Sequence, residues 1–265
     1  MITLSSDFGS PYPAAMRGVI LDRCDARLVD VSHEFPRHDV RATAFWLRET
    51  LPYFPPAVHC VVVDPGVGTD RDAIVVRVGR HALVAPDNGV VLPVARALAG
   101  LDPGESLADA THQTVEAYIV DDADAASSTF HGRDVFAPAA ARVHEVGVAA
   151  VGGMAGVETA DLDALVDCEL PAATVEGDRA EGEVLVVDDF GNAVTNVPGG
   201  FLADADAVTV NGERVPAGET FAAVPEGTQL VTVGSHGNVE CDVNRGRGDE
   251  AFGLAPGDEV TVERC

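Results

Sequence analysis

The sequence predicts a two-domain protein of the α/β class, with a Rossmann-like α/β domain at residues 1–165, a linker at 166–180 and a small β-barrel domain at 181–265. Three observations support this prediction. The first domain alternates short β-rich runs with helical stretches, which is typical of an α/β fold. A segment rich in Glu, Ala, Pro, Thr and Gly then follows without a clear period. Beyond it helix signals disappear, and the short strands that remain favour a small barrel or a sandwich.

The elements of the first domain follow one another in a regular order. The run at 58–63 is apolar and β-branched enough for a buried central strand. Strands are also predicted at 2–6, 26–32, 73–78, 81–85 and 116–120. Helices are predicted at 14–23, at 39–51, from the turn at 86–89 to about residue 98, and after residue 133 through 141.

The second domain contains only predicted strands. Asn211 and Gly212 form an Asn-Gly pair, which is a strong signal for a hairpin turn. The strands are expected at 184–187, 207–210, 230–233, 239–243 and 259–262.

The charge of the chain is strongly negative. The formal net charge is -26, from 43 acidic against 17 basic residues, and every basic residue is Arg. Such a field repels polyphosphate backbones and anionic membranes, so we expect neither nucleic-acid nor membrane binding. The acidity also indicates a halophilic protein, because a salt-rich cytoplasm screens the self-repulsion that would otherwise oppose folding.

Neither targeting nor metal-binding patterns occur. No apolar run approaches the roughly 18 residues of a spanning helix, and the chain does not start with a signal-like segment, so we expect a cytoplasmic protein. The five cysteines are scattered without a CxxC pair, and the histidines show no HxH or HxxxH spacing. We therefore expect no metal site and no cofactor.

Polar residues follow three of the predicted strands at their carboxyl ends, where open α/β sheets bind ligands. A carboxylate there can accept hydrogen bonds from ribose hydroxyls, and nearby glycines let the backbone approach closely. The alternative is that each Asp only caps a turn or a helix. The second segment lacks the GxxxxGK[ST] spacing and any lysine, which argues against a phosphate-binding loop. The segments are SSDFG at 5–9, DPGVGT at 64–69 and PDNG at 86–89.

His131 is a further candidate. It is followed by Gly132 and lies just before a predicted helix, where it could present its imidazole to a cleft. A single histidine in a loop is otherwise more often structural. Taken together, the residues alone indicate an α/β enzyme that acts on a nucleoside-like ligand.

Six segments sharpen this interpretation because they occur in one order over nearly the whole chain. They are SSDFG, VVVDPGVGTDR, APDNGV, STFHGRDVFAP, VVDDFGNAVTN and GSHGNVECDVNRG. This ordered set resembles the S-adenosylmethionine hydroxide adenosyltransferase family, whose relatives include fluorinating and chlorinating enzymes. The resemblance implies hydrolysis of S-adenosyl-L-methionine to adenosine and L-methionine, without a cofactor.

The resemblance also implies a catalytic group. In the family an Asp-Arg-His set positions and activates the attacking water, and it corresponds here to Asp64, Arg71 and His131. The halogenating relatives replace the Asp and carry Tyr in place of the His, and Gly132 stands where the fluorinating ones carry Ser. Water rather than halide is therefore the expected nucleophile. Which of Asp64 and His131 accepts the proton stays open.

Substrate-binding roles follow from the same matching. Asp7 is expected to hold the ribose hydroxyls, and Val243 and Arg245 to reach the adenine through backbone groups. The family forms homotrimers with each site between the first domain of one subunit and the second domain of its neighbour. The residues expected at the methionine end are Asp188, Phe190, Asn192, Ser235 and Glu240.

Two departures from the family pattern stand out. The segment at 9–12 is short and lacks the acidic residue that often precedes Tyr12, while Cys241 and Asp242 replace small apolar residues. Two other functions remain possible on the sequence: a non-catalytic protein that binds adenosine or S-adenosylmethionine, and an adenosyltransferase that uses halide.

Overall fold

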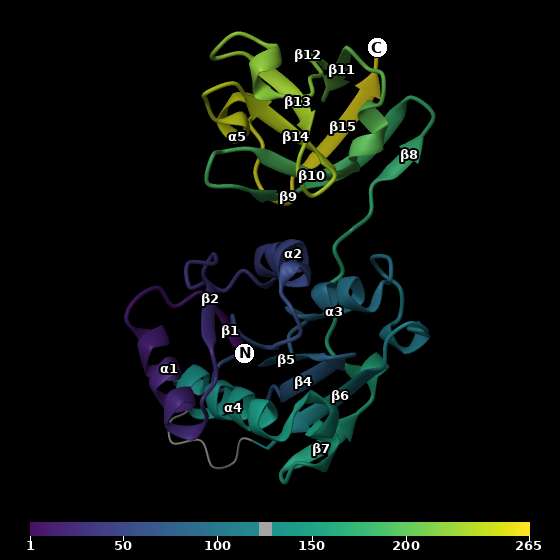
Figure 1. The fold of residues 1–265 in the computed structure, drawn as a ribbon. Coiled ribbons are helices and arrows are strands. Elements are labelled where there is room, and N and C mark those ends of the chain that lie inside the picture. Colours follow the sequence, from purple (N-terminus) through teal and green to yellow (C-terminus); the bar gives the residue numbers. More distant parts are fainter. Residues whose placement is uncertain (122–128) are drawn as a thin grey trace. The chain divides into compact units, whose positions relative to one another are not determined.

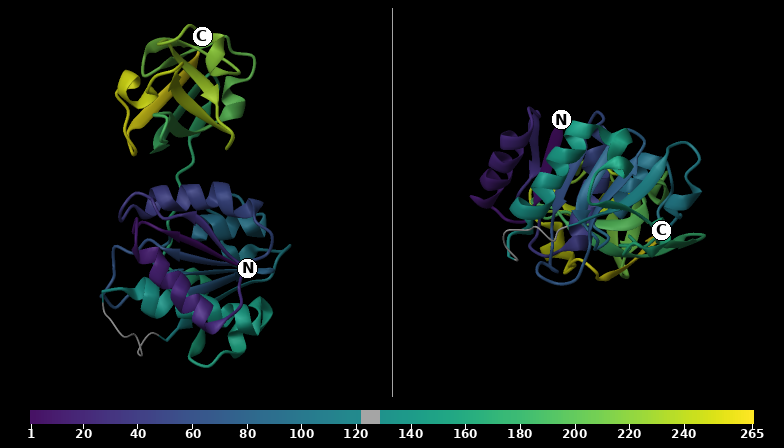
Figure 2. Two further views of the ribbon diagram at one scale, coloured as in Figure 1. Left: turned by 60° about the vertical axis from the view of Figure 1, so that its left-hand side comes forward. Right: turned by 90° about the horizontal axis from the view of Figure 1, so that it is seen from below.

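The computed structural model describes residues 1–121 and 129–265, so Ser128, the first residue of the STFHGRDVFAP segment, and Ser127 before it lie outside the described residues. The chain divides into two compact units, Met1–Leu170 and Pro171–Cys265, and each contains one large sheet (Figures 1 and 2). The predicted mixed α/β class is confirmed.

The first unit is built on a seven-stranded sheet in the order β2-β1-β3-β5-β4-β6-β7. The first four strands in this order run parallel, and β4, β6 and β7 are antiparallel to their neighbours. The strands are β1 (Ile2–Ser6), β2 (Leu28–Ser32), β3 (Val58–Val62), β4 (Ala73–Val78), β5 (His81–Pro86), β6 (Val115–Val120) and β7 (Val157–Ala160).

Helices cover both faces of this sheet, with α1 (Tyr12–Arg23) and α4 (Ala137–Val146) on one side and α2 (Val40–Thr50) and α3 (Leu92–Ala99) on the other (Figure 1). A π-helix at Gly132–Phe136 leads into α4. Two separate cores result, and β3 is buried along its whole length, as its apolar sequence predicts. Short 3-10 helices lie at Leu51–Tyr53, Leu107–Asp109, Val148–Gly153, Leu162–Ala164, Gly199–Leu202 and Phe221–Ala223.

Local signals explain where the helices begin and end. The side chain of Asp39 accepts a hydrogen bond of 2.9 Å from the backbone N–H of Ala42, which caps the first turn of α2. Gly100 ends α3 in the left-handed conformation, with a φ of 75°.

The second unit is an eight-stranded, nearly barrel-shaped sheet in the order β12-β11-β15-β9-β10-β14-β13, with β8 paired to β9. A bridge between Ala217 and Val231 joins the two ends of this order. The strands are β8 (Thr174–Glu176), β9 (Arg179–Val187), β10 (Ala193–Pro198), β11 (Ala207–Val210), β12 (Glu213–Pro216), β13 (Gln229–Val233), β14 (Asn238–Val243) and β15 (Glu259–Arg264).

Several elements differ from the prediction. Strands β7, β8, β10 and β12 were not predicted as strands, although Asn211 correctly marks the turn between β11 and β12. The second unit also contains a short helix, α5 (Gly248–Phe252), so the prediction that helices are absent there is wrong. The predicted linker at 166–180 contains β8, and β9 begins within it.

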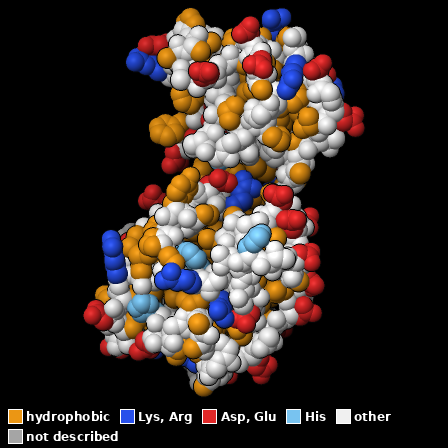
Figure 3. Space-filling view, turned by 45° about the vertical axis from the view of Figure 1, so that its right-hand side comes forward, with side chains coloured by type: hydrophobic (Ala, Val, Ile, Leu, Met, Phe, Trp, Pro, Cys, Tyr) orange, Lys and Arg blue, Asp and Glu red, His pale blue; other side chains and the backbone are white. Residues whose placement is uncertain are grey.

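Acidic side chains outnumber basic ones on the face of the molecule drawn in Figure 3, in keeping with the net charge of -26. Within the part of the chain that the structure describes, none of the helices has both the length and the apolar character needed to cross a membrane.

Candidate active site

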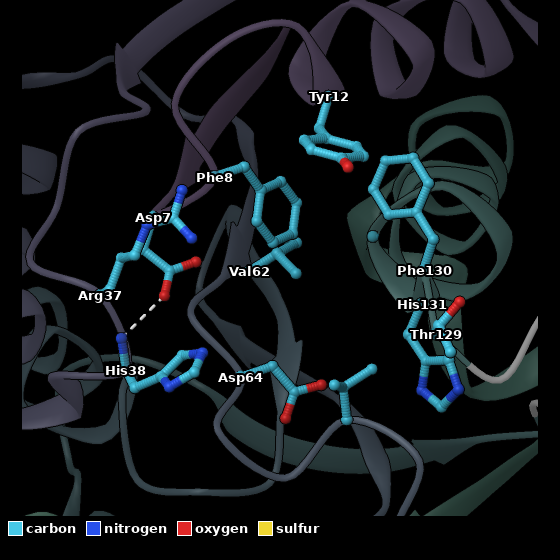
Figure 4. A pocket seen from close by; sticks show the side chains of 12 residues that line it. Asp7, Phe8, Tyr12, Arg37, His38, Val62, Asp64, Thr129, Phe130 and His131 are labelled. Carbon is cyan, nitrogen blue, oxygen red and sulfur yellow. Dashed lines mark hydrogen bonds between the residues drawn. The ribbon is translucent and has the colours of Figure 1, made fainter.

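The carboxyl ends of β1 and β3 bring two carboxylates into one pocket. The strands pair in parallel with Ser6 opposite Val62, so Asp7 and Asp64 follow at the same edge of the sheet. Both residues are buried, each with 7% of its surface exposed. They line a pocket of about 140 Å³ together with His131, which directly precedes the π-helix in the sequence (Figure 4).

Arg71 connects the other two members of the predicted catalytic group. Its Nε donates to Oδ1 and Oδ2 of Asp64 at 3.0 and 3.1 Å, and its Nη2 donates to Oδ2 at 2.5 Å. Nη2 also donates to Nδ1 of His131 at 2.9 Å. The structure thus brings Asp64, Arg71 and His131 into one hydrogen-bonded group.

This contact determines the tautomer of the imidazole. A guanidinium has only N–H donors, so Nδ1 of His131 accepts from Arg71 and the ring proton lies on Nε2. We infer this tautomer from the identity of the donor. In this state His131 offers a hydrogen-bond donor at Nε2 rather than a second acceptor.

Packing holds the group in place. The guanidinium of Arg71 lies 5.0 Å from the centre of the Phe136 ring. Oδ1 of Asp64 also accepts from the backbone N–H of Gly66 at 3.2 Å. At Gly132 an added Cβ would lie 2.9 Å from Cε2 of Phe8, so the residue after His131 must lack a side chain for this packing to form.

Asp7 is held by the chain that precedes α2. Its Oδ2 accepts a hydrogen bond of 2.8 Å from the backbone N–H of His38, whose φ is 61°. His38 also lines the pocket, and so does Arg37 (Figure 4). One face of the carboxylate of Asp7 is therefore fixed by protein, and Oδ1 is the atom that can accept from a ligand.

The third strand-end segment supports the site without lining it. The side chain of Asn88 donates from Nδ2 to the carbonyl of Val63 at 2.9 Å, next to Asp64. Oδ1 of Asp87 accepts from the backbone N–H of Val166 at 3.0 Å, and burial raises the pKa of its carboxyl. The expectation of a ligand-binding Asp at all three strand ends therefore fails for Asp87, which has a structural partner.

Sequence reasoning missed most of the pocket wall. Phe8 and Phe130 stand next to predicted site residues, so their position was a signal that could have identified them. Arg37 and His38 come from the loop before α2, and no pattern connects that loop with the ends of β1 and β3. The additional lining residues are Phe8, Tyr12, Arg37, His38, Val62, Val67, Thr129, Phe130 and Gly132.

The predicted residues of the second unit form two groups. The turn from Asp188 to Asn192 is closed by the carboxylate of Asp188, which accepts from the backbone N–H groups of Phe190 at 2.9 Å and Asn192 at 2.8 Å. The Asn192 amide also donates to it at 3.1 Å. The side chain of Phe190 is 79% exposed, and Asn192 is buried.

The other group lies on and around β14. Oε1 of Glu240 is 2.9 Å from Nε2 of His236, and Ser235 lies exposed in the preceding turn. Val243 ends the strand and is buried. Arg245 has a left-handed φ of 58° and forms an exposed ion pair with a glutamate.

Metal ligation finds no support in the described geometry: among residues 1–121 and 129–265, no three His, Cys, Asp or Glu side chains are grouped so as to hold an ion. The arrangement in the first unit instead offers a carboxylate, a guanidinium and an imidazole around a small pocket. Such a group can orient a water molecule and stabilise negative charge that develops on it.

Comparison with known proteins agrees with the resemblance seen in the sequence. Residues 2–152 match the SAM hydroxide adenosyltransferase N-terminal domain, and residues 182–261 match the C-terminal domain of the same family.

Two similar relatives are each named "(R)-S-adenosyl-L-methionine hydrolase". The one from Thermus thermophilus is 42% identical, with 97% of each chain covered, and the one from Salinispora arenicola is 38% identical, with 98% of this chain and 97% of the relative covered. A solved structure of a conserved protein from Thermotoga maritima is 30% identical, covers both chains fully and superposes with a TM-score of 0.80. The chain therefore belongs to the SAM hydroxide adenosyltransferase family.

Proposed function

We propose that this protein is an enzyme that hydrolyses S-adenosyl-L-methionine, with water attacking the ribose C5′, to give adenosine and L-methionine. The observation that carries the proposal is the group in which Arg71 bridges Asp64 and His131 beside Asp7 in one pocket. The names of the relatives support the same substrate and reaction.

The reaction is an in-line displacement in which the sulfonium leaves as a neutral thioether. Water is a weak nucleophile, since ionising it fully at pH 7 costs about 12 kcal/mol from a pKa of roughly 15.7. Alignment of the water oxygen, C5′ and sulfur contributes on the order of 7 to 11 kcal/mol. The protein must supply the remainder by removing a proton and stabilising developing charge.

We infer that Asp64 accepts the proton from the attacking water. His131 already accepts from Arg71 through Nδ1, so its Nε2–H can donate to the water oxygen but cannot take a proton from it. The carboxylate of Asp64 accepts from three N–H groups, those of Arg71 Nε, Arg71 Nη2 and Gly66, and the Nε–H is shared between its two oxygens. Since a carboxylate offers about four acceptor positions, one remains for the proton of the water. Arg71 remains charged throughout and stabilises the group as the proton moves.

The remaining predicted residues complete the proposed site. Asp7 holds the ribose hydroxyls through its open oxygen, and backbone groups around Val243 and Arg245 contact the adenine. The methionine end is bound by Asp188, Phe190, Asn192, Ser235 and Glu240. The exposure of Phe190 and Ser235 supports a role in contacting a ligand.

We further propose the finer architecture and assembly that the resemblance implies. The first domain is Rossmann-like and the second is a β-barrel, and the protein is a cytoplasmic homotrimer in which each site uses the first domain of one subunit and the second of its neighbour. Mixing His131→Ala and Asp188→Ala subunits, each expected to turn over more slowly than the wild type on its own, should then restore turnover in part. A monomeric mass by light scattering together with full turnover would contradict the shared site.

The first test of the function is to incubate the purified protein with S-adenosyl-L-methionine in high-salt buffer containing EDTA and to follow the products by chromatography. Equimolar adenosine and methionine are expected. Bound but unchanged substrate would instead favour a binding protein, and a 5′-haloadenosine formed in molar halide would favour a halogenating enzyme.

A further inference from the structure

We propose that the rings of Phe8, Tyr12 and Phe130 form an aromatic corner that binds the sulfonium of the substrate and selects it over a neutral thioether. This inference rests on the proposed function, because it assigns the recognition of the leaving group to the same pocket. All three rings line that pocket together with Asp7 and Asp64.

The three rings stand nearly perpendicular to one another. The ring centres of Phe8 and Tyr12 are 6.3 Å apart with planes at 69°, and those of Phe8 and Phe130 are 5.8 Å apart at 76°. Tyr12 and Phe130 are 5.3 Å apart at 78°. A cation interacts with an aromatic ring within about 6 Å of its centre. Rings at these separations and angles can therefore contact one cation together.

The reaction geometry directs the sulfur toward this corner. In-line displacement requires the leaving sulfur to lie on the side of C5′ opposite the water, and the water is held at Asp64 and His131. Figure 4 shows Tyr12 and the Phe8 ring on the far side of the pocket from the carboxylate of Asp64.

Charge also favours a sulfonium at the aromatic corner. Arg37 also lines the pocket, beside Asp7, and its guanidinium would repel a sulfonium brought to that part of the wall (Figure 4). Aromatic faces, in contrast, attract a positive charge.

Protein contacts hold Phe130 and Phe8 of the aromatic corner in place, whereas Tyr12 is exposed. The guanidinium of Arg133 lies 5.1 Å from the centre of the Phe130 ring and is itself bound by the carboxylate of Asp134 through two hydrogen bonds of 2.7 Å. Phe8 packs against Gly132. Tyr12 is 56% exposed, so its ring is open to a ligand and its replacement leaves the buried core intact.

The interaction should act on binding more than on the chemical step. The sulfur is positive in the bound substrate and becomes neutral as the bond breaks, so the rings stabilise the substrate more than the products. Loss of a ring should therefore weaken substrate binding without a matching loss of kcat.

The test compares two ligands that differ in this charge. Calorimetry would measure the binding of S-adenosyl-L-methionine and of S-adenosyl-L-homocysteine, the neutral thioether, in a His131→Ala background in which turnover is slowed. Tyr12→Leu is expected to lower the preference for the sulfonium by about 2- to 30-fold. Tyr12→Phe, which keeps the ring, and Tyr53→Leu, which removes a tyrosine that is 87% exposed elsewhere, should keep the preference.

Equal weakening of both ligands by Tyr12→Leu would overturn the proposal, because the ring would then contribute packing alone. Phe130→Leu tests the same preference, the affinity for S-adenosyl-L-methionine relative to that for S-adenosyl-L-homocysteine, at a second ring. Turnover of the wild-type protein tells a failure of the proposed function from a failure of the ring proposal. If the wild-type protein neither hydrolyses nor binds S-adenosyl-L-methionine, the proposed function is refuted. If it hydrolyses the substrate but Tyr12→Leu and Phe130→Leu keep the wild-type preference for the sulfonium, only the role of the rings is refuted.

Discussion

Nη2 of Arg71 lies 2.9 Å from Nδ1 of His131, so a permanently charged donor occupies one nitrogen of the imidazole. The other nitrogen must then carry the proton and face its partners as a donor. In the proposed mechanism this contact gives His131 the donor role and leaves the acceptor role to Asp64.

A donor role for His131 predicts graded losses. His131→Ala should lower kcat by about 10²- to 10³-fold, the usual cost of removing one donor that stabilises developing charge. His131→Asn should recover part of this loss, since its amide can accept from Arg71 and donate to water. Rates of adenosine release and substrate binding by calorimetry would be measured, with exposed His112→Ala as the control. Full turnover of His131→Ala would contradict the assigned role.

The proton-acceptor role of Asp64 predicts a larger effect. Asp64→Asn keeps the size of the side chain but removes the acceptor of the water proton, and kcat should fall by about 10²- to 10⁴-fold. Substrate affinity should change little, because Asp64 does not hold the substrate in this mechanism. Single-turnover kinetics would check this, with the exposed Asp70→Asn as the control. If only affinity changed, Asp64 would be a binding residue.

Local chemistry allowed much of the first unit to be predicted. The buried apolar run of β3 and the Asp39 cap of α2 are encoded in adjacent residues, and so is the position of Asp7 after β1. Contacts between distant segments could not be predicted in this way. The backbone N–H of His38 donates to Asp7 although the two residues are 31 positions apart in the sequence, and no periodicity signals such a contact.

The missed elements of the second unit have physical explanations. β9 begins at Arg179, whose guanidinium pairs with Glu263 on the neighbouring β15 and with Glu181. Charged residues that pair across strands give no apolar alternation, so this part of β9 had the composition of a linker. The helix α5 is only five residues long and is tied down by the bond from Asp249 N–H to the carbonyl of Gly191, a tertiary contact.

The close approach at Gly132 predicts that even a methyl group is costly there. Gly132→Ala would place a Cβ at 2.9 Å from Phe8 and 3.2 Å from Phe130, so either ring or the loop that carries His131 must move. We expect a loss of about 1 to 3 kcal/mol in the free energy of unfolding and a lower kcat. Gly153→Ala is the matched control, since nothing lies within 4 Å of its added Cβ. Wild-type stability and kcat in Gly132→Ala would show that the rings adapt freely.

Burial of His59 predicts that acid destabilises the first unit. Its Nδ1 is 2.8 Å from the Thr3 hydroxyl and its Nε2 is 3.0 Å from His81, and burial lowers the pKa of its imidazole to about 3. The unfolded chain takes up this proton near pH 6.5 and the folded chain does not, so stability falls as the pH drops from 6.5 toward 3. The loss is at most on the order of 5 kcal/mol.

Urea unfolding at pH 7.5, 5.5 and 4.5 would measure this slope. His59→Gln should be less stable at neutral pH but should show a shallower decline in acid. The exposed His112→Gln should retain the wild-type decline. An unchanged slope in His59→Gln would mean that other groups cause the acid sensitivity.

Asp242 predicts the opposite slope in the second unit. It is fully buried on β14, and burial, reinforced by the nearby Glu240 and Asp188 carboxylates, raises the pKa of its carboxyl to about 7. The hydroxyl of Thr232 donates to its Oδ2 at 2.7 Å, and among the described residues Oδ1 has no hydrogen-bond partner. The folded protein therefore keeps a proton that the unfolded chain loses near pH 4.

The contribution of Asp242 to stability must then decline as the pH rises from about 4 to 7, by at most on the order of 4 kcal/mol. Asp242→Asn mimics the protonated side chain, so it should match the wild-type protein at pH 4 or below and exceed its stability at pH 8. The exposed Asp178→Asn, in the same unit, should show no such divergence. Urea unfolding at both pH values would measure the difference in stability between Asp242→Asn and the wild type. If this difference were the same at both pH values, Asp242 would ionise alike in the folded and unfolded chains.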